Sequence, residues 1–212
     1  LFGFPRGHSF SVTAATGLKL VNSDPAFELF LRRRGVDPAH LSQLSPAAFA
    51  ALTEGPDSPR GAAKRVRDAQ MALWTQGRLG LVLDGTGDEY PKIARRVHAL
   101  RELGYDPFMV FVNTTLEVAQ ARNAARSRRL PETVVASIWR DVQRNLGAFQ
   151  GLFGARNFAV VDNTVYGPVP KQIHTLTTAF LRRDVENPIG RRWIRDELEA
   201  KASGEAPRRR VA

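Results

Sequence analysis

The sequence predicts an α/β protein in which a parallel sheet is flanked by helices. Short apolar runs alternate along the chain with longer stretches of helical periodicity, and each apolar run breaks off at Asn or Asp. Runs that are continuously apolar, rather than alternating, are typical of strands covered on both faces. Strands that alternate with helices of this length favour helical crossovers and therefore parallel pairing.

Apolar runs and helical periodicity place the individual elements. The strand signals are residues 18–24 (LKLVNSD), 78–87 (RLGLVLDGTG), 106–115 (DPFMVFVNTT) and 157–164 (NFAVVDNT). Helical spacing predicts helices over residues 63–78, 90–105, 115–129 and 130–153. Gly104 is expected to end the second helix, and Pro131 is expected in the first turn of the fourth.

Domain organisation follows from where these patterns begin and end. Residues 1–185 are expected to form one α/β domain. Within it, residues 38–60 are expected to form a lid-like insertion with one short helix (LSPAAFAAL). Residues 186–212 are expected to form a tail with one helix over residues 191–202 and a disordered basic end. Val66, Leu73 and Trp74 are expected on an apolar helix face, with Trp139 in a core position.

Composition excludes several classes of site. The chain has no Cys, so it has neither a disulfide framework nor a zinc site built on thiolates. Its four His residues are scattered without metal-ligand spacing. No apolar run approaches the roughly 20 residues that span a bilayer, and the N-terminus does not resemble a signal peptide. We therefore expect a cytoplasmic protein without a membrane partner.

The charge is strongly basic, at +10, and 26 of the 31 basic residues are Arg. Because Arg offers a planar fork of donors suited to phosphate, a phosphate-bearing partner is one interpretation. Solvated helix faces and a compositional bias toward Arg are the other. The total charge does not decide between them.

Polar residues at the strand ends predict a shared site. The first two strands end in Asn22-Ser23-Asp24 and Asp84-Gly85-Thr86-Gly87, and the other two end at Asn113 and at Asp162-Asn163. In open α/β sheets, ligands bind outside the carboxyl ends of the strands. The alternative for each position is a helix N-cap, a role that Thr86 or Asp88 is expected to fill for the helix near Pro91.

An arginine cluster follows the third strand. Arg122 and Arg126 are four residues apart, hence on one face of the predicted helix, and Arg128 and Arg129 come next. One interpretation is a clamp on a phosphoryl group, where Arg neutralises developing charge. The other is pairing with nearby carboxylates: Glu117, Glu132 or Asp141.

Taken together, several segments resemble one family. GLKLVNSD, GRLGLVLDGTGDEYPKI, LRELGYDPFMVFVNTTLEVAQARNAARSRRLPETVV and FAVVDN are similar to the P-loop kinases of the zeta-toxin and polynucleotide-kinase-like group, which have an adenylate-kinase-like core. The resemblance covers about residues 17–165. It implies a three-layer parallel sheet of the P-loop NTPase type, with ATP and Mg²⁺ as cofactors.

The resemblance also implies roles for the polar residues. Asp24 corresponds to the general base that faces the substrate hydroxyl, with Asn22 and Ser23 beside it in the substrate site. Asp84, Gly85 and Thr86 correspond to residues near the acceptor or the Mg²⁺–phosphate region, which makes Asp84 the metal candidate. The remaining assignments lie near ATP: Arg122 and Arg126 at the phosphates, Arg128 or Arg129 as substitutes, and Asp162 and Asn163 near adenine.

One departure from the family concerns the phosphate loop. G-x-x-x-x-G-K-[ST] is absent, since the segment LFGFPRGHSFSVTAA has Gly3 and Gly7 but no Lys precedes Lys19. No apolar first strand precedes it either. An N-terminally incomplete chain, a scrambled start such as a frameshift gives, and a real loss of ATP binding are three explanations.

The function expected from the resemblance is an ATP-dependent kinase acting on a hydroxyl of a nucleotide, polynucleotide or small metabolite. The alternative is a non-catalytic nucleic-acid-binding remnant of such a kinase, using the arginines and the basic end Arg208–Arg210 on phosphate backbones. A purely structural remnant is a third interpretation. The sequence does not predict the oligomeric state.

Overall fold

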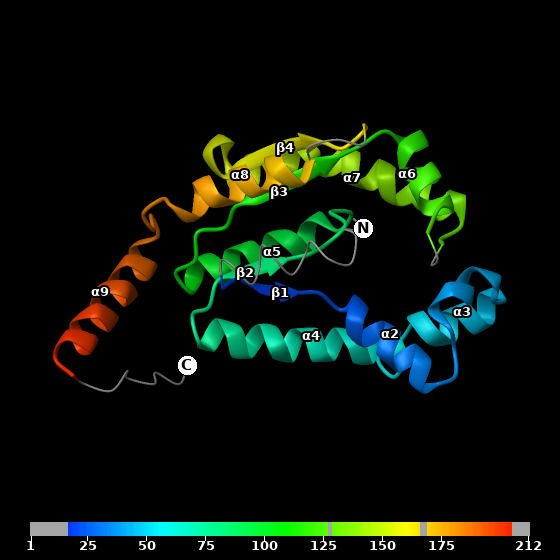
Figure 1. The fold of residues 1–212 in the computed structure, drawn as a ribbon, viewed down its shortest axis with the longest axis horizontal. Coiled ribbons are helices and arrows are strands. Elements are labelled where there is room, and N and C mark those ends of the chain that lie inside the picture. Colours follow the sequence, from blue (N-terminus) through cyan, green and yellow to red (C-terminus); the bar gives the residue numbers. More distant parts are fainter. Residues whose placement is uncertain (1–16, 127–128, 166–168, 205–212) are drawn as a thin grey trace. The chain divides into compact units, whose positions relative to one another are not determined.

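The computed structural model describes residues 17–126, 129–165 and 169–204. Within these ranges the protein is mixed α/β, with mostly helices and two short parallel sheets (Figure 1). The elements in chain order are β1 (Lys19–Val21), α2 (Asp24–Arg33), η1 (Pro38–Gln43), α3 (Pro46–Thr53), α4 (Pro59–Gln76), β2 (Leu81–Leu83), α5 (Tyr90–Glu102), β3 (Met109–Asn113), α6 (Leu116–Ala124), α7 (Glu132–Phe153), η2 (Ala155–Asn157), β4 (Phe158–Asp162), α8 (Val169–Leu181) and α9 (Pro188–Ala202).

Both sheets consist of two parallel strands, which confirms the predicted strands and their parallel pairing. β1 pairs with β2, with Leu20 opposite Val82. β3 pairs with β4, with Phe111 opposite Val160. In each pair the two strands are connected through helices, as parallel strands require. β1 and β2 are three residues long, and the polar residues Asn22 and Asp84 follow them directly.

The described residues belong to two compact units. The first comprises those of Leu1–Thr86 and Leu116–Trp139, and the second those of Gly87–Thr115 and Arg140–Ala212. β1 and β2 therefore lie in the first unit, and β3 and β4 lie in the second. The chain passes from one unit to the other inside the segment Asp84-Gly85-Thr86-Gly87.

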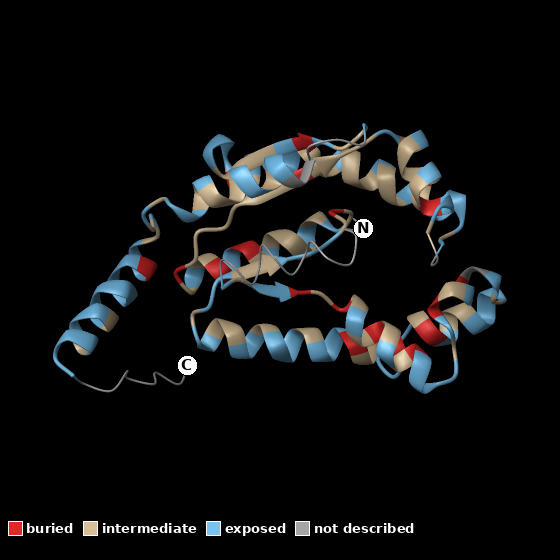
Figure 2. Cartoon of the chain, in the orientation of Figure 1, coloured by how far each residue is buried: buried red, intermediate tan, exposed pale blue. Residues whose placement is uncertain are grey.

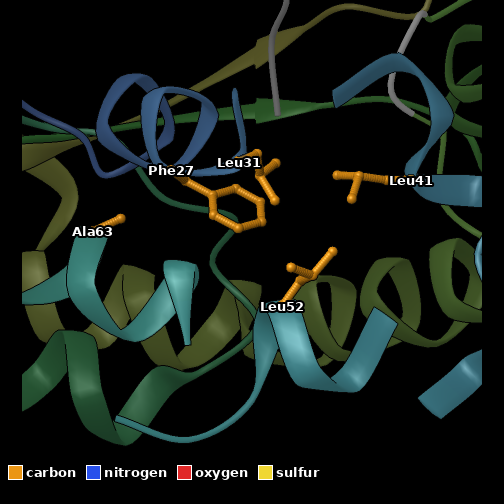
Figure 3. Packing of buried hydrophobic residues seen from close by; sticks show 5 residues of the cluster. All are labelled: Phe27, Leu31, Leu41, Leu52 and Ala63. Carbon is orange, nitrogen blue, oxygen red and sulfur yellow. The ribbon is translucent and has the colours of Figure 1, made fainter. Parts of the chain in front are cut away.

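A helical cap between β1 and β2 has its own hydrophobic core. Five buried residues from α2, η1, α3 and α4 point toward one another (Figure 3): Phe27, Leu31, Leu41, Leu52 and Ala63. Serine side chains form the N-caps of two of its helices. Ser45 Oγ accepts from Ala48 N in α3, and Ser58 Oγ accepts from Gly61 N in α4. The predicted insertion over residues 38–60 is thus an ordered part of this cap.

Two helices were not foreseen in the sequence. α2 follows the first polar strand end directly, with Pro25 in its first turn and Arg32 and Arg33 in its last. These are ordinary start and stop signals, and the N-cap alternative for the strand ends applies here, because Ser23 occupies the N-cap position. α8 lies in the second unit, where Phe180 stacks on Phe108 at a centroid distance of 4.8 Å.

The prediction that Val66 and Leu73 lie on a buried apolar face of α4 is wrong. Val66 and Leu73 are 38% and 66% exposed, whereas α4 buries Pro59 and Ala63 near its start. Figure 2 shows the buried positions gathered where α2, α3 and the first turns of α4 meet. The helical period was interpreted correctly, but the residues that anchor α4 are at its N-terminal end. Trp74 is half-buried.

The second unit has an aromatic core. Tyr90 from α5, Phe111 from β3 and Phe149 from α7 pack at centroid distances of 5.4 and 6.4 Å from the Phe149 ring. Val97 and Phe153 are also buried in this cluster. α5 ends at Glu102, and Gly104 follows with φ 95°, as expected for a glycine that stops a helix.

The expected helix in residues 186–212 is confirmed as α9, whose first turn is anchored to the end of α5. A Cβ added at Gly104 would lie 2.7 Å from Gly190 N, so the two backbones touch. Asn187 Nδ2 donates to Arg101 O at 2.8 Å, and Asp106 Oδ1 accepts from Asn187 N at 3.1 Å. The basic end, residues 205–212, lies outside the described residues.

We predict that Gly104→Ala lowers the free energy of unfolding by about 2–4 kcal/mol, because it combines a left-handed φ with backbone overpacking. Urea denaturation measures this loss, and hydrogen exchange of the α9 amides should rise. Gly154→Ala is the matched control: φ is 74° there but nothing lies within 4 Å, so only about 1 kcal/mol is expected. Equal losses at both positions would contradict the proposed contact.

Candidate functional site

The first two polar strand ends come together at one side-chain amide. Because β1 and β2 are parallel neighbours, their carboxyl ends adjoin. Asn22 Nδ2 donates to Asp84 Oδ2 at 2.9 Å, and Asn22 Oδ1 accepts from Asp24 N at 2.8 Å. Asn22 therefore holds the carboxylate at the end of β2 and the first residue of α2 at the same time.

An arginine that the sequence did not single out completes this cluster. Arg60 Nη1 donates to Asp24 Oδ1 at 2.6 Å. The same guanidinium lies over the Phe27 ring, with Cζ 5.1 Å from its centroid. We call Asn22, Asp24, Arg60 and Asp84 the strand-end cluster. Arg60 was missed because it is 36 residues from Asp24, although its place after Ser58-Pro59 marks a helix start.

The other predicted residues beside this cluster differ in accessibility. Ser23 is 6% exposed and occupies the N-cap position of α2 without a side-chain capping bond. Gly85 is exposed, and a Cβ there would meet nothing within 4 Å. Thr86 is half-buried. Gly85 thus has room for a ligand but no crowding that requires glycine, whereas Ser23 presents little of its side chain to solvent.

The predicted cap of α5 is wrong. Its N-cap is Glu89, which makes no side-chain capping bond, rather than Thr86 or Asp88. The backbone before the helix is instead held from α7, because Asn145 Nδ2 donates to Gly87 O at 3.0 Å and to Asp88 O at 2.8 Å. Gly87 is buried with φ 85°, so glycine is required there by the turn.

The arginine cluster does not lie on one helix face, because α6 ends at Ala124. Arg122 is in its last turn, and Arg126 follows in the connection to α7. Arg129 is exposed and its Nε donates to Arg126 O at 3.0 Å. Arg128 lies outside the described residues.

A buried asparagine closes the loop that carries these arginines. Asn123 is 8% exposed; its Nδ2 donates to Leu130 O at 2.7 Å, and its Oδ1 accepts from Leu130 N at 2.9 Å. Leu130 lies outside both α6 and α7, and these two side-chain bonds give its N–H and C=O groups the partners that helical pairing would otherwise supply. Pro131 then leads into α7. One side chain therefore joins the end of α6 to the residue before Pro131.

The polar ends of β3 and β4 are joined to each other within the second unit. Asn163 N donates to Asn113 O at 2.8 Å, and Gln143 Nε2 donates to Asn113 Oδ1 at 2.8 Å. Asp162 Oδ1 accepts from Thr164 Oγ1 at 2.5 Å and from Thr164 N at 2.8 Å. These two bonds, the hydroxyl first, hold the pKa of Asp162 below its usual 3.8.

Metal-ligand clustering is absent from the described residues, where no three His, Asp or Glu side chains gather around a possible ion. Mg²⁺ at phosphate-transfer sites is held by one or two carboxylates together with substrate phosphates. Asp84, exposed at the end of β2, suits that coordination, but a metal cage made by the protein alone does not form among these residues. No helix in the described ranges could cross a membrane.

Comparison of the chain with family models, with curated proteins and with solved structures finds no match. The functional interpretation therefore rests on the residues themselves.

We predict that Asn123→Ala lowers the free energy of unfolding by about 1–3 kcal/mol, because Leu130 loses both partners in a partly buried position. Chemical denaturation measures the loss, and the Leu130 amide should exchange faster. Gln150→Ala removes an exposed amide from α7 and should change stability by less than about 0.5 kcal/mol. An unchanged Leu130 exchange rate would disprove the bridge.

We also predict that Thr164→Val raises the pKa of Asp162 toward 3.8 but leaves it below that value, because the backbone N–H remains as a donor. A carboxyl ¹³C titration by NMR measures it, with Thr175→Val in α8 as the control that leaves the midpoint in place. Since the folded pKa is lowered, the contribution to stability is present above 3.8 and disappears as pH falls through the folded value. A midpoint unaffected by Thr164→Val would contradict this assignment.

Proposed function

We propose that the protein is an ATP-dependent kinase that phosphorylates a hydroxyl group, with Asp24 as the general base. The observation that carries the proposal is the strand-end cluster. At the adjoining ends of two parallel strands, the Asn22 amide bonds the Asp84 carboxylate and the Asp24 backbone N–H, and Arg60 bonds the Asp24 carboxylate. This is the place where α/β sheets bind substrates. The Asp24 side chain is 23% exposed, so it is both fixed and accessible.

In the proposed reaction, an Asp24 carboxylate oxygen accepts the proton of the acceptor hydroxyl. The hydroxyl oxygen forms a bond to the γ-phosphorus of ATP as the bond from that phosphorus to the ADP oxygen breaks. Asp24 then releases its proton to water, so the carboxylate is regenerated. Positioning and charge neutralisation supply most of the rate in such transfers.

The cofactors of this proposal are ATP and Mg²⁺. Asp84 would hold Mg²⁺ together with phosphate oxygens, and the ion would neutralise charge on the phosphates. Arg122, Arg126 and Arg129 would contact the ATP phosphates, and Asn163 would lie near the adenine. No G-x-x-x-x-G-K sequence occurs in the chain, so the backbone phosphate cradle of P-loop proteins is not supplied by these 212 residues.

The proposed function also implies a particular fold, the three-layer P-loop kinase fold. Two parallel strand pairs, each with a helical crossover, are components of a three-layer P-loop kinase fold. In that fold both pairs would belong to one sheet with a further strand that leads to the phosphate loop. Residues 1–185 would then form the kinase domain, with α9 as an appended helix.

A second candidate function is nucleic-acid binding without catalysis. The observation that favours it is the loop closed by Asn123 and Leu130, which contains several arginines. The whole chain is also rich in Arg and has a net charge of +10. Such binding would weaken strongly with salt, because arginines release counterions from phosphates. It would require neither Asp24 nor ATP.

The test replaces Asp24 in a version of the chain to which a strand and a phosphate loop are added at the start, called the restored chain. We predict transfer of labelled phosphate from ATP to a hydroxyl acceptor, and a loss of at least about 100-fold for Asp24→Asn, because the general base is removed. Asp57→Asn, an exposed carboxylate of the helical cap, is the matched control and should leave transfer unchanged.

Full activity of Asp24→Asn would show that the assigned base is wrong. Salt-sensitive DNA or RNA binding by the restored chain, with no measurable ATP binding, would favour the second function instead.

A further inference from the structure

Arg60 reaches Asp24 from a tightly built turn. Gly55, with φ 78°, and Pro56 lie so close to Gly61 that an added Cβ there would collide with their backbone oxygens. Ser58 is 5% exposed and its Oγ donates to Gly55 O at 2.9 Å while accepting from Gly61 N at 3.0 Å. The backbone on both sides of Arg60 is therefore fixed by buried contacts.

The guanidinium of Arg60 is fixed as well. It lies over the ring of Phe27, which is 3% exposed and belongs to the core of the helical cap. Its bond to Asp24 Oδ1 joins two side chains that are 29% and 23% exposed. Because these groups are partly buried, solvent screens their attraction less than it screens an exposed pair.

Helix stability does not account for an arginine at this position. Arg60 stands in the first turn of α4, where the positive end of the helix dipole disfavours a cation. The first turn of α4 contains no acidic residue to offset it. The contacts that hold this cation against its own helix dipole are therefore the Asp24 carboxylate and the Phe27 ring.

We propose that Arg60 is a positioning residue for the general base. It orients the Asp24 carboxylate by holding Oδ1, while Asn22 holds the Asp24 backbone, so that the carboxylate faces the acceptor hydroxyl in one orientation. An Arg guanidinium has donors and no acceptor, so Arg60 can only donate to Oδ1 and cannot itself take the proton. The proposal rests on the proposed kinase function and adds that the helical cap sets the geometry of the base.

The first measurement concerns the pair itself in the full chain. Guanidinium ¹⁵N–¹H NMR signals of Arg60, assigned by their loss in Arg60→Lys, should be sharp and should shift in Asp24→Asn. Lys64→Ala removes an exposed charge one turn along α4 and should leave these signals in place. Arg60 signals that do not respond to Asp24→Asn would overturn the proposal.

The second measurement is phosphate transfer from ATP to a 5′-hydroxyl oligonucleotide and to a free nucleoside, used as probes, by the version of the chain that carries an added phosphate loop. We expect Arg60→Ala to lower kcat by about 10- to 100-fold with KM for ATP within about twofold, since orientation rather than ATP binding is lost. Arg60→Lys should recover part of kcat, and Lys64→Ala should retain all of it. Adding Arg60→Ala to Asp24→Asn should cause no further loss, because the residue acts through Asp24.

The outcomes separate the two proposals. Transfer that is lost in Asp24→Asn but unchanged in Arg60→Ala would overturn the role of Arg60 and leave the kinase function standing. An equal fractional loss in the wild-type and Asp24→Asn backgrounds, together with a lower melting temperature, would make Arg60 a structural tie between α2 and α4 and overturn the proposal. Absence of transfer to either probe, with the Arg60 signals intact, would remove the kinase function and the positioning role together.

Discussion

The geometry of the candidate site depends on the two hydrogen bonds of one asparagine amide. Asn22 uses its oxygen to fix the first N–H of α2 and its nitrogen to fix the carboxylate after β2. An amide can accept through its oxygen and donate through its nitrogen at the same time, in one plane. This bridge adds to the backbone bond from Asp84 N to Val21 O at 3.2 Å, so the end of the three-residue strand pair keeps Asp24 and Asp84 close together.

Much of the fold could be predicted from the sequence because its signals are local. Continuous apolar runs identified β3 and β4, and Gly104 marked the end of α5 through a left-handed φ that glycine favours. The exposed side of α4 could not be predicted, because periodicity shows that one face is apolar but not what covers it. α2 was missed since a strand end and a helix start share the same residues.

Part of the candidate site could also be predicted, because its signals in the sequence are local. Asn22, Asp24 and Asp84 stand at strand ends, and parallel pairing of β1 with β2 brings strand ends together. Arg60 forms an ion pair with Asp24, which is far from it in the sequence. Asn123 uses its buried amide to bond Leu130 across a loop. A single sequence contains no signal for such contacts, because neither periodicity nor composition encodes which loop returns to which strand.

The Asn123–Leu130 bridge joins the two ends of the connection between α6 and α7 through a single side chain. Asn123 pairs with both the N–H and the C=O of Leu130, so one side chain joins the last turn of α6 to the residue before Pro131. Substitutions between these two residues can then change the charge of the connection while Asn123 still joins its ends. The bridge thus lets the charge of this part of the chain vary at little cost to folding.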